Sequence, residues 1–136
     1  REEVRRFFCD TWKKKTDGHI LDPMETIAGD WMEQHPEYHS LLADPEGAIS
    51  QDYTPERGET NPFLHLSMHL SISEQISIDQ PPGIKAIAEK LSQKLGSMHE
   101  AQHSMMECLG QVMWEAQREG KPLNPENYLE ALKRLI

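Results

Sequence analysis

Apolar residues recur every three or four positions along most of this chain, a spacing typical of amphipathic helices. Phe7, Phe8 and Trp12 belong to one such stripe, which ends at Asp17-Gly18. No segment alternates apolar and polar residues in the manner of a β-strand. Helices are predicted at residues 2–16, 23–34, 36–43, 62–78, 84–95 and 97–119, with a last one that begins at Asn124-Pro125.

Proline and acidic residues mark where several of these helices begin. Proline, which is tolerated at the first helical position, follows a capping residue at Asp22-Pro23 and again at Asn124-Pro125. Residues 22–25 and 97–100 also have the acceptor-x-x-Glu form of a capping box. The sequence therefore predicts an all-α protein, a compact bundle of about six helices without a β-sheet. We expect a single domain over residues 1–136, with a loop-rich segment at 44–60.

The composition narrows the class of protein. The chain has 136 residues and is long enough to bury a core, and 37% of its residues are hydrophobic. Its 14 Lys and Arg oppose 23 Asp and Glu, and the net charge of -9 makes nucleic acids and anionic membranes poor partners. The 2 cysteines lie outside any CxxC motif, and no apolar run reaches the length of a membrane span, so we expect a cytoplasmic protein.

The candidate chemistry lies in the histidines. Six of the 7 form pairs at i, i+4 spacing, where random placement would give well under one pair. On a helix this spacing puts both imidazoles on one face. The pairs are His35/His39, His65/His69 and His99/His103. His65 and His69 lie in the middle of an inward stripe, and two buried imidazoles without an ion would each need hydrogen bonds. Metal binding is therefore favoured over core packing for this pair.

The pair at 99 and 103 adds a carboxylate. His99-x3-His103-x3-Glu107 forms a ladder of three ligands on one helix, a mixture that suits zinc, iron, manganese or nickel. An up-down-up topology would make the two histidine helices parallel and bring their ligands to one end of the bundle. The positive N-terminal helix ends oppose a cation there, and Glu107 would supply negative charge. The candidate metal ligands are His65, His69, His99, His103 and Glu107, with His39 next and His35 behind it.

Residues 99–103 also match the HExxH pattern of zinc peptidases. Glu100 has a competing role in the capping box, and no strand is predicted to hold a substrate, so a peptidase is disfavoured. Ferritin-like bundles carry Glu-x-x-His on two helices, and this sequence lacks that pattern of two. A likeness to hemerythrin-like or nickel- and zinc-dependent bundles is an analogy. No catalytic residue is assigned.

Several longer stretches resemble one known family. They are residues 61–70 (NPFLHLSMHL), 77–84 (SIDQPPGI), 35–39 (HPEYH), 58–60 (GET) and 99–109 (HEAQHSMMECL). Together they are similar to the small bacterial proteins grouped as domain of unknown function 1841, over nearly the whole chain. The resemblance implies a cytosolic bacterial protein of about this length, and it supplies no catalytic assignment.

The sequence thus favours a helical bundle that binds one or two transition-metal ions, with metal-assisted hydrolysis or redox chemistry as the reactions such a site would support. Whether the protein is an enzyme stays open. The alternative is a non-enzymatic interaction module, with a homodimer among its forms, whose histidines are structural or bind a structural zinc. A pH-sensing module is a third hypothesis, because buried histidine pairs titrate near neutrality. The partner, a protein or a small molecule, is not identified.

Overall fold

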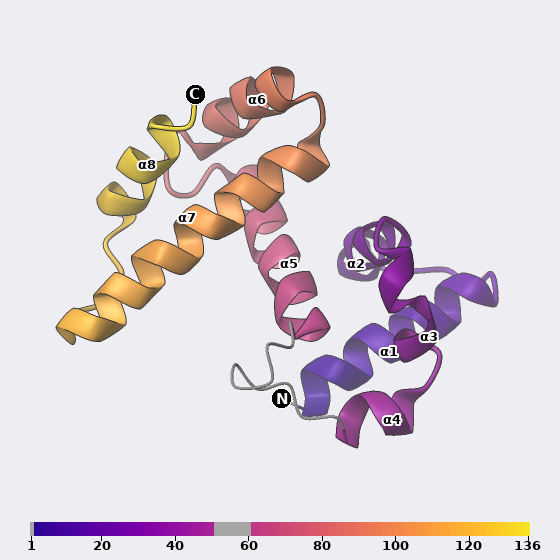
Figure 1. Cartoon of the computed structure of the whole chain (residues 1–136). Helices are drawn as coiled ribbons and strands as arrows, with labels where there is room; N and C mark the ends of the chain where they lie inside the picture. Colours follow the sequence, from indigo (N-terminus) through magenta and orange to yellow (C-terminus); the bar gives the residue numbers. More distant parts are fainter. Residues whose placement is uncertain (1, 51–60) are drawn as a thin grey trace. The chain divides into compact units, whose positions relative to one another are not determined.

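The computed structural model describes residues 2–50 and 61–136, and every regular element in this part of the chain is helical, as predicted (Figure 1). The α-helices are α1 (Glu2–Thr16), α2 (Pro23–Glu33), α3 (His39–Leu42), α4 (Pro45–Ser50), α5 (Pro62–Ile78), α6 (Ile84–Leu95), α7 (Met98–Glu119) and α8 (Pro125–Lys133). A 3-10 turn, η1 (Pro36–Tyr38), precedes α3. The predicted helix at 36–43 is therefore a 3-10 turn followed by one turn of α-helix.

The chain divides into two compact units, Arg1–Leu70 and Ser71–Ile136. These are the first and the second unit. The boundary between them falls inside α5. The expectation of a single domain stays a prediction.

The helix starts follow the capping chemistry read from the sequence. The backbone N–H of Glu25 donates to Asp22 Oδ1 at 2.7 Å, and the N–H of Asp22 donates to Glu25 Oε1 at 3.0 Å, which completes the predicted capping box of α2. Of the capping box predicted at 97–100, the structure shows the Ser97 side: Ser97 Oγ accepts from the N–H of Glu100 at 3.1 Å and caps α7. At the other end of a helix, Gly96 stops α6 with a positive φ of 96°, a conformation that glycine adopts without strain.

In the first unit, α1 packs against α2, α3 and α4 (Figure 1). The buried core consists of Phe8, Cys9, Ala28, Trp31, Met32, Leu42, Ala48, Phe63 and Leu66. The Arg5 side chain is buried as well, and its guanidinium donates to the carbonyls of Ala48 at 2.8 Å and Ile49 at 3.2 Å. These carbonyls lie in the last turn of α4. The buried charge of Arg5 therefore ties α1 to α4.

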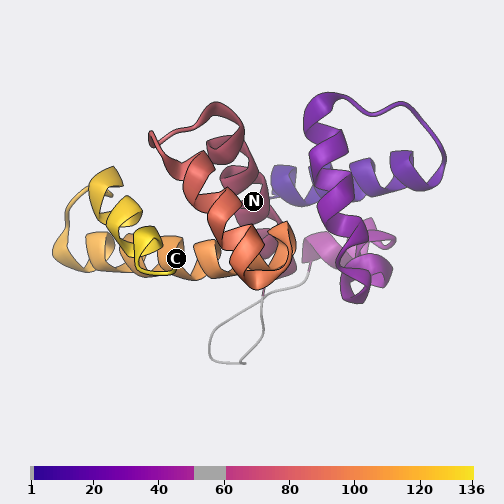
Figure 2. The ribbon, with the colours of Figure 1, turned by 90° about the horizontal axis from the view of Figure 1, so that it is seen from above.

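In the second unit, α6 and α8 both pack against α7, as the two views show (Figures 1 and 2). The buried apolar residues here are Ile72, Ile84, Ile87, Ala88, Leu91, Ala101, Met105, Met106, Leu109, Val112, Tyr128 and Leu132. The Tyr128 hydroxyl donates to Gln75 Oε1 at 2.9 Å, and Gln102 Nε2 donates to Ser73 Oγ at 3.0 Å. These bonds satisfy polar groups that α7 and α8 bring against the second half of α5.

The segment expected to be loop-rich contains the short helix α4. Its remaining part, 51–60, which includes Gly58-Glu59-Thr60, lies outside the described residues. Among the helices that the structure describes, none is long and apolar enough to cross a membrane.

Candidate metal centre

His35 lies where α2 ends and η1 begins, and its side chain is buried with 3% exposure. Its Nδ1 lies 2.7 Å from the backbone carbonyl oxygen of Trp31. A carbonyl can only accept a hydrogen bond, so Nδ1 carries the proton. In the neutral ring the lone pair is then on Nε2, the tautomer in which a histidine ligates a metal through Nε2.

His65 and His69 lie one turn apart on α5. His65 Nε2 is 3.2 Å from His69 Nε2, and it is also 3.1 Å from His35 Nε2. His69 is fully buried and His65 is half-buried. We call these three residues the three-histidine cluster; all of them belong to the first unit.

The two Nε2–Nε2 contacts of this cluster compete for hydrogen atoms. His35 Nε2 is an acceptor, so its contact with His65 needs a proton on His65 Nε2. If His69 Nε2 were the donor in the second contact, His65 Nε2 would need a lone pair instead. In neutral rings one hydrogen atom must therefore serve both contacts. A cation among the three nitrogens can accept a lone pair from each of them.

The distances fit such a cation. Zinc binds histidine nitrogens at about 2.0–2.1 Å, and the edge of a tetrahedron of that size is about 3.3 Å. The two Nε2–Nε2 distances of 3.1 and 3.2 Å are close to this edge. A ligating nitrogen of His35 also lies within 4.8 Å of one of His69. The first unit therefore contains histidines that could hold a metal ion.

Two aromatic rings lie flat against the cluster. The Trp31 indole stacks on His69 with ring centroids 3.9 Å apart and an interplanar angle of 14°. The Tyr38 ring is parallel to His35, with centroids 5.3 Å apart and planes 2° from parallel. Burial, and then the charge of Glu37, raise the pKa of the Tyr38 phenol, which keeps it neutral beside the histidines. Sequence reasoning missed both residues; the available signal was an aromatic residue four positions before and three after His35.

His39, which the sequence placed ahead of His35, has different contacts. Its Nε2 donates to the carbonyl of Met32 at 2.8 Å, and its ring stacks on Trp12 with centroids 4.3 Å apart. It is half-buried, whereas His35 is buried, so His35 is the more inward of the two. The ligand role predicted for His39 stays a prediction, but its Nε2 is committed to a carbonyl.

The second unit carries the other predicted pair. His99 and His103 lie one turn apart on α7, with ring centroids 4.4 Å apart and an interplanar angle of 71°. A ligating nitrogen of each lies within 4.8 Å of one on the other, so this pair could also contribute to a metal site. Glu107, the expected third member of the ladder, is exposed. Glu100 is exposed as well, and its N–H is engaged by the Ser97 cap.

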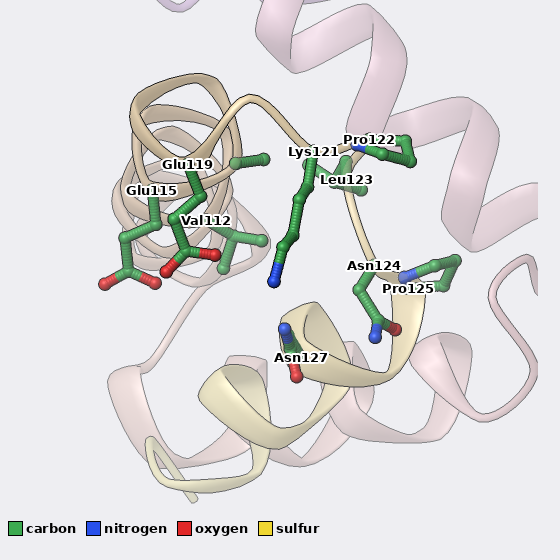
Figure 3. Close-up of a pocket in the computed structure, with 10 residues that line it drawn as sticks. Val112, Glu115, Glu119, Lys121, Pro122, Leu123, Asn124, Pro125 and Asn127 are labelled. Carbon is green, nitrogen blue, oxygen red and sulfur yellow. The ribbon is translucent and has the colours of Figure 1, made fainter.

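A surface hollow of about 550 Å³ lies between the end of α7 and the start of α8. Figure 3 shows the carboxylates of Glu115 and Glu119 on one side of it, Asn124 and Asn127 on the other, and Lys121 reaching in between. All five side chains are exposed. A small-molecule site encloses most of its ligand and holds it with fixed polar groups, so this hollow identifies no ligand.

Fold and site together define a class: an all-α protein with buried histidines that could bind a metal ion. Within that class the chain belongs to the family described as domain of unknown function (DUF1841), whose model matches residues 1–134. The family resemblance seen in the sequence is therefore confirmed. Neither a curated protein nor a solved structure matches this chain.

Proposed function

We propose that this protein binds a transition-metal ion through Nε2 of His35, His65 and His69. The observation that supports the proposal most strongly is the convergence of these three nitrogens, with Nε2–Nε2 distances of 3.1 and 3.2 Å. Imidazole ligands suit zinc, iron, nickel and copper, while manganese prefers oxygen ligands. Zinc, iron and nickel are therefore the favoured ions of those expected from the sequence.

The chemistry that the site would support depends on which ion it binds. Zinc would supply Lewis acidity for hydrolysis, and iron would supply redox chemistry. The residues of this chain have separate tasks: the Trp31 carbonyl fixes the His35 tautomer, and the neutral Tyr38 phenol lies beside the ligands. Participation of His99, His103 and Glu107 in the same function stays a prediction from their spacing.

Zinc titration of chelator-treated, untagged protein tests the proposal. We expect about one equivalent to bind to the three-histidine cluster, and His65→Ala to weaken binding by more than about 100-fold. This loss of affinity exceeds the roughly 10–100-fold that is typical for residues that hydrogen-bond to metal ligands. We expect the larger effect because His65 itself contributes the central nitrogen. His39→Ala is the matched control, since it removes an imidazole of the same unit that bonds to a carbonyl.

Equal zinc affinity of the wild type and His65→Ala would contradict the proposal and favour histidines that serve only packing, as in an interaction module. A His99→Ala, His103→Ala double variant tests whether the two histidines of α7 contribute to zinc binding. Unchanged affinity in that variant assigns the ion to the three-histidine cluster alone, whereas a large loss adds the α7 pair.

A further inference from the structure

We propose that Trp31 is a positioning residue of the metal site, which holds two of its ligands at once. This inference rests on the proposed metal binding. Trp31 contacts the three-histidine cluster with both its backbone and its side chain, while its indole is 7% exposed and belongs to the core of the first unit.

The backbone contact acts on His35. The carbonyl oxygen of Trp31 accepts from His35 Nδ1 at 2.7 Å, which determines both the tautomer and the direction of Nε2. Ligating histidines generally bond to a carbonyl or carboxylate through their second nitrogen, and this bond raises the basicity of the ligand. The carbonyl is located near the end of α2. Its position depends on the last turn of α2, and the buried indole anchors that turn.

The side-chain contact acts on His69. The indole covers the imidazole at 3.9 Å between centroids, with the planes 14° apart, so the ring of His69 cannot tilt toward Trp31. A metal ion draws electron density from the imidazole. An electron-poor ring is attracted more strongly to the electron-rich face of an indole. The contact is therefore stronger with metal bound than without, which is the condition for Trp31 to raise metal affinity.

The chain contains a matched control for this effect. Trp12 stacks on His39 with centroids 4.3 Å apart and planes 29° apart, also in the first unit. His39 is outside the proposed ligand set because the ligands converge through Nε2, and Nε2 of His39 faces the carbonyl of Met32 instead. Removing either indole costs core packing, but only the loss of Trp31 frees a proposed ligand.

The test is titration of Trp31→Leu, Trp31→Phe and Trp12→Leu with cobalt(II), followed by its visible absorption, with helicity of each variant checked by circular dichroism. We expect Trp31→Leu to bind cobalt about 10–100-fold more weakly than wild type, the range for residues that orient metal ligands. Trp31→Phe retains a flat ring and should restore most of the affinity. Trp12→Leu should bind as wild type does. Equal affinity of Trp31→Leu and Trp12→Leu would overturn the role of Trp31.

A second readout uses Trp31→Phe, so the test does not depend on Trp31→Leu folding. Cobalt bound beside Trp31 should quench tryptophan fluorescence in the wild type, and Trp31→Phe should lose most of this quenching while its absorbance still reports binding. Undiminished quenching in Trp31→Phe would place the ion away from Trp31 and refute the inference. Absence of cobalt and zinc binding in the wild type would instead refute the proposed function itself.

Discussion

At the scale of the single residue, the histidines differ in which ring nitrogen is engaged and in what the other nitrogen faces. His35 donates through Nδ1 to the carbonyl of Trp31, so its Nε2 meets His65 Nε2. His39 donates through Nε2 to the carbonyl of Met32. Both carbonyls lie near the end of α2, and that of Met32 also accepts the backbone N–H of His35 at 3.1 Å. Because Nε2 faces another histidine in His35 and a carbonyl in His39, we propose His35 as a ligand and His39 as a packing residue.

This difference predicts separate effects for the two residues. His39→Ala removes the bond to the Met32 carbonyl and the stack on Trp12, so we expect a loss of about 1–2 kcal/mol in the free energy of unfolding. Its zinc affinity should not change. Urea denaturation of the metal-free protein measures the first effect, and zinc titration measures the second. If His39→Ala lost zinc as His65→Ala is expected to, His39 would belong among the ligands.

The site could be predicted from the sequence only where a helix is continuous. His65 and His69 share a face because α5 runs unbroken through both, so their spacing indicates their proximity. Between His35 and His39 the chain leaves α2 and makes a 3-10 turn, in which residues four apart do not share a face. The contribution of His35 to the site depends on its contact with His65, which lies 30 residues away in the sequence. No local sequence pattern indicates this contact.

At the scale of the element, the boundaries of the longer helices were predictable because their signals are local. Proline at the first helical position, the Asp22/Glu25 capping box and the glycine that ends α6 act within one turn of the residues they affect. The short elements of residues 36–50 were less predictable. One turn of helix has little stability of its own, and contacts with α1 determine where these turns form.

We expect the capping box of α2 to contribute measurably to the free energy of unfolding. Asp22→Ala removes the acceptor for the N–H of Glu25, and we expect it to cost about 1 kcal/mol in the free energy of unfolding. Asp30→Ala, an exposed change on the same helix, is a control for the lost negative charge. Urea denaturation of both variants at pH 7 compares them. Equal stability of the two variants would show that the box contributes nothing beyond charge.

The same box predicts a pH dependence. Lys14 Nζ lies 2.8 Å from Glu25 Oε2, and its hydrogen bond, followed by that from the N–H of Asp22, lowers the pKa of Glu25 from its ordinary value of 4.5. Glu25 therefore binds protons less readily in the folded state than in the unfolded state. Its contribution is present above pH 4.5 and is lost as the pH falls through the lowered value.

We therefore expect Glu25→Gln to flatten the decline of stability with acid over that window, and to be less stable than wild type at pH 7. Thermal unfolding of the metal-free proteins between pH 3 and 7 measures this. Parallel profiles for the two proteins would contradict a lowered Glu25 pKa.

At the scale of the whole molecule, an all-α fold of the DUF1841 family is established, and metal binding is the proposal that its histidines support. The net charge of -9 would attract divalent cations to the protein. Composition and periodicity predicted the fold class because every helix contributes to that signal. They could not predict the full ligand set, since three ring nitrogens converge only through tertiary packing.

Metal binding is best tested by the metal content of the untagged protein, purified without chelator and measured by inductively coupled plasma mass spectrometry. We expect about one equivalent of zinc, iron or nickel in the wild type and in His39→Ala, and almost none in His65→Ala. A wild type that contains no transition metal and gains none on incubation with these ions would contradict it. The three-histidine cluster would then be a packing feature of the first unit.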